Sequence, residues 1–357
     1  MIQELEIEEA VRKQFVEEAR IWHEMYEDAL ISRGEYWSAR ILAAYLGWEF
    51  IDAHDIFELT AQGWSVMKSG GAKLLANVRA GKSTVVPGFY GRAGIFDAIK
   101  LFPRNGTDTS GILIAEVLKA DRYEIWKDTA VRVASPKIVP NARIVPYLAY
   151  REARALTDRG SEVVHPDAVL LAQRQDLTIR VCDFNNPDAP GTIIQSDDLV
   201  PPPVPGYLSG VSGRTGMSVA TITKSGMHEE TGIAGAVMQI FGNHKLRIHH
   251  MPDGIDSIDA VVETDAIELK LSSIARDVQS ILGGTAQVRH RKGYALVTVV
   301  GRGLTGIIPR SRLMGALGRA GIDPLTYGQG TEQHIFTFTV EEKDFENSIR
   351  AICREFT

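Results

Sequence analysis

Hydrophobic and polar positions follow two different periods along residues 1–197. Residues 1–30 place apolar side chains at helical spacing among many charges, which predicts an amphipathic helix. A break at Ser32-Arg33-Gly34 is expected before a second helix over 36–46. Strand-like runs then alternate with helical patterns: strands at 84–86, 123–126 and 177–182, helices at 111–118, 150–157 and 166–173. This alternation predicts an α/β fold with a mostly parallel sheet and helices on both faces.

A proline-rich stretch separates this region from the rest of the chain. Residues 198–206 contain Pro201, Pro202, Pro203 and Pro205. Proline has no backbone N–H and a fixed φ angle, so the stretch cannot continue a helix or a central strand. We therefore expect an extended linker at 198–206 that follows a domain at 1–197.

Beyond the linker the order of strands and helices repeats. The first copy has a strand at 217–223, a helix at 232–241 and a strand at 257–263; the second has 294–300, 311–320 and 335–340, and a helix at 343–356 closes the chain. Two βαββαβ units in series are typical of ferredoxin-like α+β modules. The predicted modules cover 207–285 and 286–357.

Composition and charge exclude several classes of protein. Hydrophobic residues make up 44% of the chain and charged residues 24%, which is typical of globular domains. No apolar run approaches the roughly 20 residues of a membrane span, and the first residues lack a signal-peptide pattern. The net charge is −6 with acidic and basic residues interspersed, so no nucleic-acid surface is predicted. Cys182 and Cys353 are far apart, which favours buried thiols in a cytoplasmic protein and no metal site.

The segment from Phe102 to Gly111 has the composition of an anion-binding helix start. It reads Phe-Pro-Arg-Asn-Gly-Thr-Asp-Thr-Ser-Gly and directly precedes an apolar helical pattern. Backbone N–H groups at a helix start, beside the Arg104 guanidinium, suit a phosphate or a carboxylate. Asp108 can bind an amino group or cap the helix, and from this segment alone a plain capped helix is the better interpretation.

Seven segments, taken in order, resemble segments of the aspartokinase family. The loop at 104–108 resembles the family's R-x-G-S-D loop. The other six are Ser32-Arg33-Gly34-Glu35 (S-x-G-E), 87–91 (P-G-F-x-G), 124–128 (E-x-W-T-D), 136–142 (D-P-R-x-V-P-x-A), 150–153 with 160–166 (Y-x-E-A and G-A-K-V-L-H-P) and 186–192 (N-P-x-A-P-G-T). No single segment is specific, but seven in register are, and the resemblance extends from Glu27 onward.

The resemblance implies an amino-acid-kinase catalytic domain, which is a carbamate-kinase-like parallel-sheet sandwich, followed by two ferredoxin-like ACT domains. It implies ATP-dependent phosphorylation of the side-chain carboxylate of L-aspartate, with Mg²⁺ bridging the phosphates, as the first step of lysine, threonine and methionine biosynthesis. Phosphoryl transfer depends mainly on positioning and charge neutralisation. By resemblance Glu35 and Asp108 hold the substrate ammonium, Arg104 and Thr107 hold its carboxylate, and Arg104 and Asp108 are the catalytic pair. The implied nucleotide-binding residues are Trp126, Lys127, Asp128, Arg132 and Lys137.

The chain also departs from the family pattern. Family members begin with K-F-G-G-T-S, whose lysine neutralises the transferred phosphate, and no Lys-Phe-Gly-Gly occurs here. Residues 127–132 lack the second aspartate and the aromatic residue of T-D-V-D-G-V-Y, and Glu162 replaces the lysine of G-A-K-V-L-H-P. We therefore expect a catalytic domain that is incomplete at its N-terminus and has little activity alone. The alternative is a regulatory subunit or pseudokinase that binds an amino acid and partners a complete kinase. The tandem ACT pair argues against a uridylate or acetylglutamate kinase.

The regulatory half keeps the spacing of lysine-sensitive family members. In the family the effector lies between ACT domains of two subunits, which implies a homodimer through these domains. Asp253 and Asp256 suit a cationic amino acid such as L-lysine, although Pro252-Asp253-Gly254 alone is better interpreted as a turn. The implied effector-binding residues are Met227, Gly232, Ile248, His249, Asp253, Gly254, Ile255 and Asp256.

Overall fold

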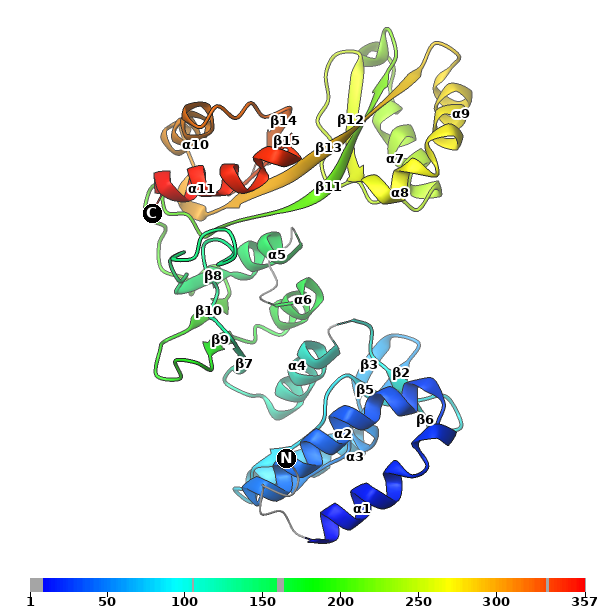
Figure 1. The fold of residues 1–357 in the computed structure, drawn as a ribbon, viewed down its shortest axis with the longest axis vertical. Helices are drawn as coiled ribbons and strands as arrows, with labels where there is room; N and C mark the ends of the chain where they lie inside the picture. The colour runs from blue at the N-terminus through cyan, green and yellow to red at the C-terminus, as the bar shows by residue number, and fades with distance from the viewer. Residues whose placement is uncertain (1–8, 105, 159–163, 332–333, 357) are drawn as a thin grey trace. The chain divides into compact units, whose positions relative to one another are not determined.

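The computed structural model describes residues 9–104, 106–158, 164–331 and 334–356 (Figure 1). The chain divides into two compact units: unit 1 comprises 1–127, 164–182 and 193–196, and unit 2 comprises 128–163, 183–192 and 197–357. Among the described residues no helix is both long and apolar enough to cross a bilayer.

Unit 1 is an α/β body in which helices alternate with short strands. Its elements are α1 (Glu9–Ala19), α2 (Glu27–Leu46), β1 (Glu49–Phe50), β2 (Phe57–Thr60), β3 (Gly63–Val66), α3 (Lys68–Arg79), β4 (Thr84–Val85), β5 (Tyr90–Ala93), β6 (Ala98–Leu101), α4 (Gly106–Leu118), β7 (Tyr123–Lys127), α6 (Pro166–Arg174) and most of β9 (Ile179–Asp183) and β10 (Thr192–Gln195). The strands and helices predicted near 84, 111, 123, 166 and 177 are therefore confirmed.

The strands of unit 1 belong to several small sheets. β1 pairs with β4 in parallel, with Glu49 opposite Thr84 and Phe50 opposite Val85. A second sheet has the order β3-β2-β5-β6, in which β2 and β5 run parallel and the other pairs run antiparallel. β7, β9 and β10 follow one another in a third sheet.

Helix α2 corrects one expectation about unit 1. It runs without interruption from Glu27 to Leu46, so the predicted break at Ser32-Arg33-Gly34 is wrong. Ser32 is fully buried and donates to the Ala29 carbonyl at 2.7 Å, and the buried Arg33 pairs with Glu18 of α1 at 3.2 Å. Glycine inside a helix costs only about 0.5–1 kcal/mol, and these tertiary contacts outweigh that cost.

Aromatic side chains form much of the unit 1 core. Trp37, Phe57 and Tyr90 are at most 2% exposed. Phe57 meets Phe102 edge to face at 5.5 Å, and Trp64 stacks on Phe102 at 3.9 Å between ring centroids. This cluster packs the segment that leads into α4 firmly against the β3-β2-β5-β6 sheet.

Unit 2 contains the predicted ferredoxin-like modules. Its elements are β8 (Tyr147–Ala149), α5 (Tyr150–Asp158), β11 (Gly210–Thr223), α7 (Ile233–Asn243), β12 (Ser257–Glu263), α8 (Thr264–Glu268), α9 (Leu271–Leu282), β13 (Gln287–Val300), α10 (Ile307–Arg319), β14 (Thr326–Gln329), β15 (Ile335–Glu341) and α11 (Phe345–Phe356).

The two modules share one antiparallel sheet of five strands. The order is β12-β11-β13-β15-β14, and β11 and β13 are each 14 residues long, so both strands run through both modules (Figure 1). A bulge between Arg214 and Met217, with Gly216 at a φ of 70°, marks the point at which β11 passes from one module to the other. The predicted strands at 217–223 and 294–300 are therefore halves of longer strands.

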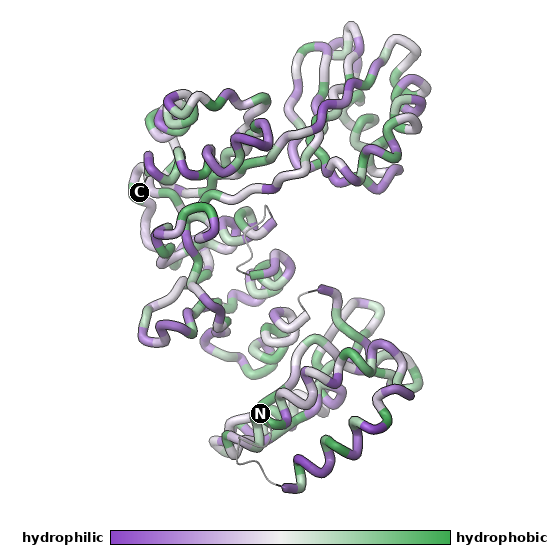
Figure 2. The backbone as a smooth tube through the Cα atoms, in the orientation of Figure 1, coloured by the Kyte–Doolittle hydropathy of each residue, from purple (hydrophilic) through white to green (hydrophobic). Residues whose placement is uncertain are grey.

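Each half of this sheet is covered by helices of its own module. Apolar residues of α7 and α9, including Val237, Phe241 and Val278, pack with β11 and β12 in one core. On the other half, Gly213 leaves room for the Phe345 ring of α11, since a Cβ at Gly213 would lie 2.6 Å from that ring. Figure 2 shows that β13 is hydrophilic along its first half and hydrophobic along its second half, which contains Ala295–Val300.

Candidate functional site

Helix α4 begins at the predicted anion-binding segment. A Cβ at Gly106 would lie 2.3 Å from the Phe102 Cβ, so only glycine fits at the first position of the helix. A Cβ at Gly88 would lie 2.9 Å from the Thr107 Cγ2. The structure therefore brings the Pro-Gly-Phe loop, 87–89, into contact with the first turn of α4. Asn105 lies outside the described residues.

The acidic residue of this turn contacts a third motif segment. The His165 backbone N–H donates to the Asp108 Oδ2 at 3.4 Å. Burial raises the pKa of the Tyr123 hydroxyl, and the Asp108 carboxylate raises it further. Asp108 is half-buried, while Arg104 and Thr107 are exposed beside it. A cation, a hydroxyl and a carboxylate thus flank one helix start, whose dipole favours an anion.

The α2 segment that contains Glu35 is linked to the same region through Tyr90. The Arg33 guanidinium lies over the Tyr36 ring at 4.5 Å and 6.0 Å from the Tyr90 ring. Tyr90 follows Phe89 directly and donates its hydroxyl to the Asp52 Oδ1 at 2.7 Å. No ion pair with another described residue engages the half-buried Glu35 carboxylate. The structure thus joins the 32–36 segment to the 87–91 loop, and through that loop to α4.

The predicted nucleotide-binding residues divide between the two units. Trp126 and Lys127 end β7 in unit 1, where the Trp126 indole is 48% exposed. Asp128, Arg132 and Lys137 belong to unit 2. An exposed indole can stack on the base of a nucleotide.

Asp128, Arg132 and Lys137 of unit 2 differ in the contacts that they make within the protein. The Arg132 guanidinium donates to the Thr129 hydroxyl at 2.9 Å and to the Ala142 carbonyl at 2.8 Å, so two of its donors bond to neighbouring protein groups. The Asp128 carbonyl accepts a hydrogen bond from Asn185 at 3.0 Å. Lys137 is exposed. Glu162 lies outside the described residues.

One motif residue has a structural role that the sequence did not indicate. Glu152 of the Tyr-Arg-Glu-Ala segment is 2% exposed and accepts hydrogen bonds from the Ala149 N–H, the Ser209 hydroxyl and the Arg302 N–H. A buried carboxylate is stable only when satisfied in this way. Within unit 2 it connects α5 to the loop after β13.

A polar pocket of about 410 Å³ lies in the first ferredoxin-like module. Its charged lining residues are Lys224 and Asp256, and Thr223, Ser225, Ser257, Thr285 and Gln287 complete the lining. The Asp256 Oδ1 accepts from the Met227 N–H at 3.1 Å. Lys224 pairs with Glu230. Sequence reasoning missed Lys224 because the pocket also depends on residues 285–287, about 60 positions away along the chain.

The remaining predicted effector residues do not line this pocket. Gly232 precedes α7 with a φ of 87°, and Met227 and Ile248 belong to the apolar core of the module. Asp253 and Gly254 form a turn, in which the Gly254 N–H donates to the Ser257 carbonyl. Ile255 is 73% exposed.

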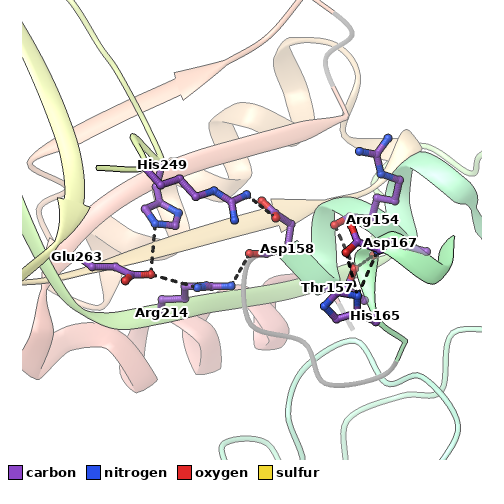
Figure 3. A network of polar contacts seen from close by, with 10 residues as sticks. Arg154, Thr157, Asp158, His165, Asp167, Arg214, His249 and Glu263 are labelled. Carbon is purple, nitrogen blue, oxygen red and sulfur yellow. Dashed lines mark hydrogen bonds and ion pairs between the residues drawn. The ribbon is translucent and has the colours of Figure 1, made fainter. Parts of the chain in front are cut away.

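His249 lies in a separate polar network (Figure 3). It is 5% exposed, and its Nε2 lies 3.5 Å from a Glu263 carboxylate oxygen. The Arg214 guanidinium contacts the same Glu263 oxygen and donates to the Asp158 carbonyl at 2.8 Å. This network joins β11 and β12 to the end of α5.

Comparison with known proteins identifies the family. The model of the amino acid kinase family matches residues 2–183. The chain is 29% identical to aspartokinase 3 of Bacillus subtilis over 346 residues, 93% of this chain and 75% of that protein. It is 25% identical to the chloroplastic aspartokinase 1 of Arabidopsis thaliana, covering 92% of this chain and 60% of that protein. The crystal structure of Clostridium acetobutylicum aspartate kinase superposes with a TM-score of 0.83 at 27% identity, covering all of this chain and 81% of that one, which confirms the predicted fold class. The chain therefore belongs to the amino acid kinase family.

Proposed function

We propose that this chain is an aspartate kinase, which transfers the γ-phosphoryl group of ATP to the side-chain carboxylate of L-aspartate. The observation that carries the proposal is the convergence of three motif segments at the start of α4, where Arg104, Thr107 and Asp108 stand together. Aspartokinases that match more than nine-tenths of the chain support it.

The charges at the start of α4 suit L-aspartate, which has one ammonium and two carboxylates. Asp108 and Glu35 bind the ammonium, and Arg104 with the Thr107 hydroxyl and the helix N–H groups binds the α-carboxylate. This arrangement leaves the side-chain carboxylate to react. One of its oxygens forms a bond to the γ-phosphorus while the bond from that phosphorus to the β–γ bridging oxygen breaks, and ADP leaves with the electron pair. The attacking carboxylate is already ionised at neutral pH, so no general base is needed.

Positioning and charge neutralisation are the protein's contribution to such a transfer. The exposed Trp126 indole can stack on the base, and Lys127 carries a charge opposite to that of the phosphates. Mg²⁺, when bound, neutralises the phosphate oxygens. Asp128, Arg132 and Lys137 remain predicted nucleotide ligands.

Titration calorimetry with L-aspartate tests the substrate site without requiring turnover. Asp108→Asn is expected to weaken binding at least tenfold, because removing one partner of a hydrogen-bonded charge pair costs about 2 kcal/mol or more. Asp121→Asn is the matched control, since Asp121 is exposed and follows the other end of α4. Tighter binding of N-acetylglutamate or UMP than of L-aspartate would overturn the assignment.

We further propose that the Lys224–Asp256 pocket binds a regulatory amino acid, with L-lysine as the preferred effector. An amino acid needs one cationic and one anionic partner, and the two charged residues of this pocket supply them. We also propose a homodimer formed through the ACT domains, for which the exposed Met238 of α7 and Ile281 of α9 offer apolar contacts. Light scattering should then report at least a dimer.

A further inference from the structure

The second turn of α4 contains a glycine that the packing requires. A Cβ at Gly111 would lie 2.3 Å from the hydroxyl oxygen of Tyr123 and 2.5 Å from its Cζ atom. These distances are far below van der Waals contact, so the end of the Tyr123 ring occupies the space that a side chain at 111 would fill. Glycine weakens a helix interior relative to alanine, so this contact has a cost in stability. Breaches of local rules of this kind are expected at functional sites.

Helical spacing places the contact on the face of α4 that carries Asp108. Residues three positions apart on a helix are neighbours on its surface, and side chains lean toward the helix N-terminus. Gly111 follows Asp108 by three positions, so the space over Gly111 borders the Asp108 side chain. Burial, as the larger cause, and then the Asp108 carboxylate raise the pKa of the Tyr123 hydroxyl, which agrees with this placement.

Strand β7 fixes the other end of Tyr123. Tyr123 is the first residue of β7, and its backbone N–H donates to the Thr178 carbonyl at 2.8 Å. In Figure 1 β7 lies next to α4, and Asp108, Gly111, Tyr123 and Thr178 all belong to unit 1. The side chain is therefore anchored at its backbone and confined at its hydroxyl, which leaves it little rotamer freedom.

The other contacts of Asp108 hold it only weakly. Its Oδ2 accepts from the His165 backbone N–H at 3.4 Å, which is longer than an ordinary hydrogen bond. In the part of the chain that the structure describes, no ion pair engages the Asp108 carboxylate and no hydrogen bond engages the Tyr123 hydroxyl. A carboxylate that binds an ammonium group needs a fixed position, and the neighbouring phenol can supply it.

We propose that Tyr123 is a positioning residue for the L-aspartate site, in which the phenol admitted by Gly111 holds the Asp108 carboxylate toward the substrate ammonium. With substrate bound, the hydroxyl donates to that carboxylate. The ring also shields one side of the carboxylate from water, which strengthens its attraction to the ammonium. The inference rests on the proposed function, because it requires that Asp108 bind the ammonium. If Tyr123 only fills the core, its variants lose stability and keep their ligand preference.

Titration calorimetry with L-aspartate and with succinate, which lacks the ammonium, separates the two roles in the full 357-residue chain. Tyr123→Phe keeps the ring and should weaken L-aspartate binding about fivefold, as expected for the loss of one hydrogen bond. Its affinity for succinate should not change, because succinate has no ammonium for Asp108 to bind. Tyr45→Phe is the matched control, at a 60% exposed tyrosine near the end of α2, and should bind both ligands as the wild type does.

Gly111→Ala tests the contact itself. Its methyl group displaces the phenol, so L-aspartate binding should weaken by about tenfold or more. Tyr123→Val removes the ring, and adding Gly111→Ala to it should change binding by less than about twofold. Gly318→Ala in α10 is the matched control, because a Cβ there would meet no atom within 4 Å.

The proposal is overturned if Tyr123→Phe binds L-aspartate as tightly as the wild type, or loses affinity for succinate to the same extent. It is also overturned if Gly111→Ala has the same effect with and without the ring. Should Gly111→Ala fail to fold, Tyr123→Phe decides. These outcomes leave the proposed function standing, whereas a wild-type chain that binds no L-aspartate would overturn both.

Discussion

Two sheets, one in each unit, differ in how completely they are covered. In unit 2, five antiparallel strands bury Val297, Val299 and Phe338 under the chain's own helices, and each of these side chains is fully buried. In unit 1, the parallel pair β1–β4 leaves Trp48 and Val78 about half exposed beside an apolar groove. The sheet of unit 2 is therefore covered by its own helices, whereas the parallel pair β1–β4 of unit 1 lies beside apolar side chains that are half in water.

This difference predicts that truncation to alanine is costly in the covered sheet and nearly neutral beside the exposed one. Phe338→Ala is expected to destabilise unit 2 by about 3–5 kcal/mol, because it opens a cavity in a closed core. Val78→Ala should change the stability of the chain by no more than about 0.5 kcal/mol, because its side chain is already largely hydrated.

Urea unfolding can assign each effect to its unit. All five tryptophans, at 22, 37, 48, 64 and 126, lie in unit 1, so their fluorescence follows unit 1. Far-UV circular dichroism follows both units. Phe338→Ala should move the dichroism transition and leave the fluorescence transition in place. Equal midpoints for Phe338→Ala and the wild type would contradict the contrast between the two sheets.

Ligand binding at the effector pocket is expected to change the stability of the chain by less than Phe338→Ala does. L-lysine at 100 times its dissociation constant should stabilise the chain by about 2.7 kcal/mol, which is visible as a melting shift of several degrees in calorimetry. Asp256→Asn should abolish the shift, because Asp256 supplies the anionic wall of the pocket. Asp253→Asn is the matched control on the same loop and should keep it. A larger shift with L-threonine than with L-lysine would refute the effector assignment.

Sequence patterns predicted the long and strongly periodic elements well. The strand at 257–263 is β12 to the residue, and the helices at 150–157 and 166–173 agree with α5 and α6 within one residue. The short strands β2, β3, β5 and β6 were missed because four residues carry too little periodicity. The shared strands β11 and β13 were assigned to single modules because a strand's partners are set by tertiary pairing, which local pattern does not contain.

The candidate site, too, depends on tertiary contacts that the local sequence pattern does not contain. Sequence resemblance found the segments at 32–35, 87–91 and 104–108, and the structure shows that close packing at Gly88 and Gly106 is what joins the last two. The buried role of Glu152 and the pocket position of Lys224 depend on residues far along the chain. Neither residue could be assigned from spacing alone.

Aspartyl-hydroxamate formation tests the central claim most directly, namely that the start of α4 holds the L-aspartate site of an aspartate kinase. ATP, Mg²⁺, L-aspartate and hydroxylamine are supplied to the wild-type chain, to Asp108→Asn and to the control Asp121→Asn. We expect L-aspartate-dependent product from the wild type and from Asp121→Asn, with Asp108→Asn lowering it by about 10²- to 10³-fold. Product that Asp108→Asn leaves unchanged would contradict the claim.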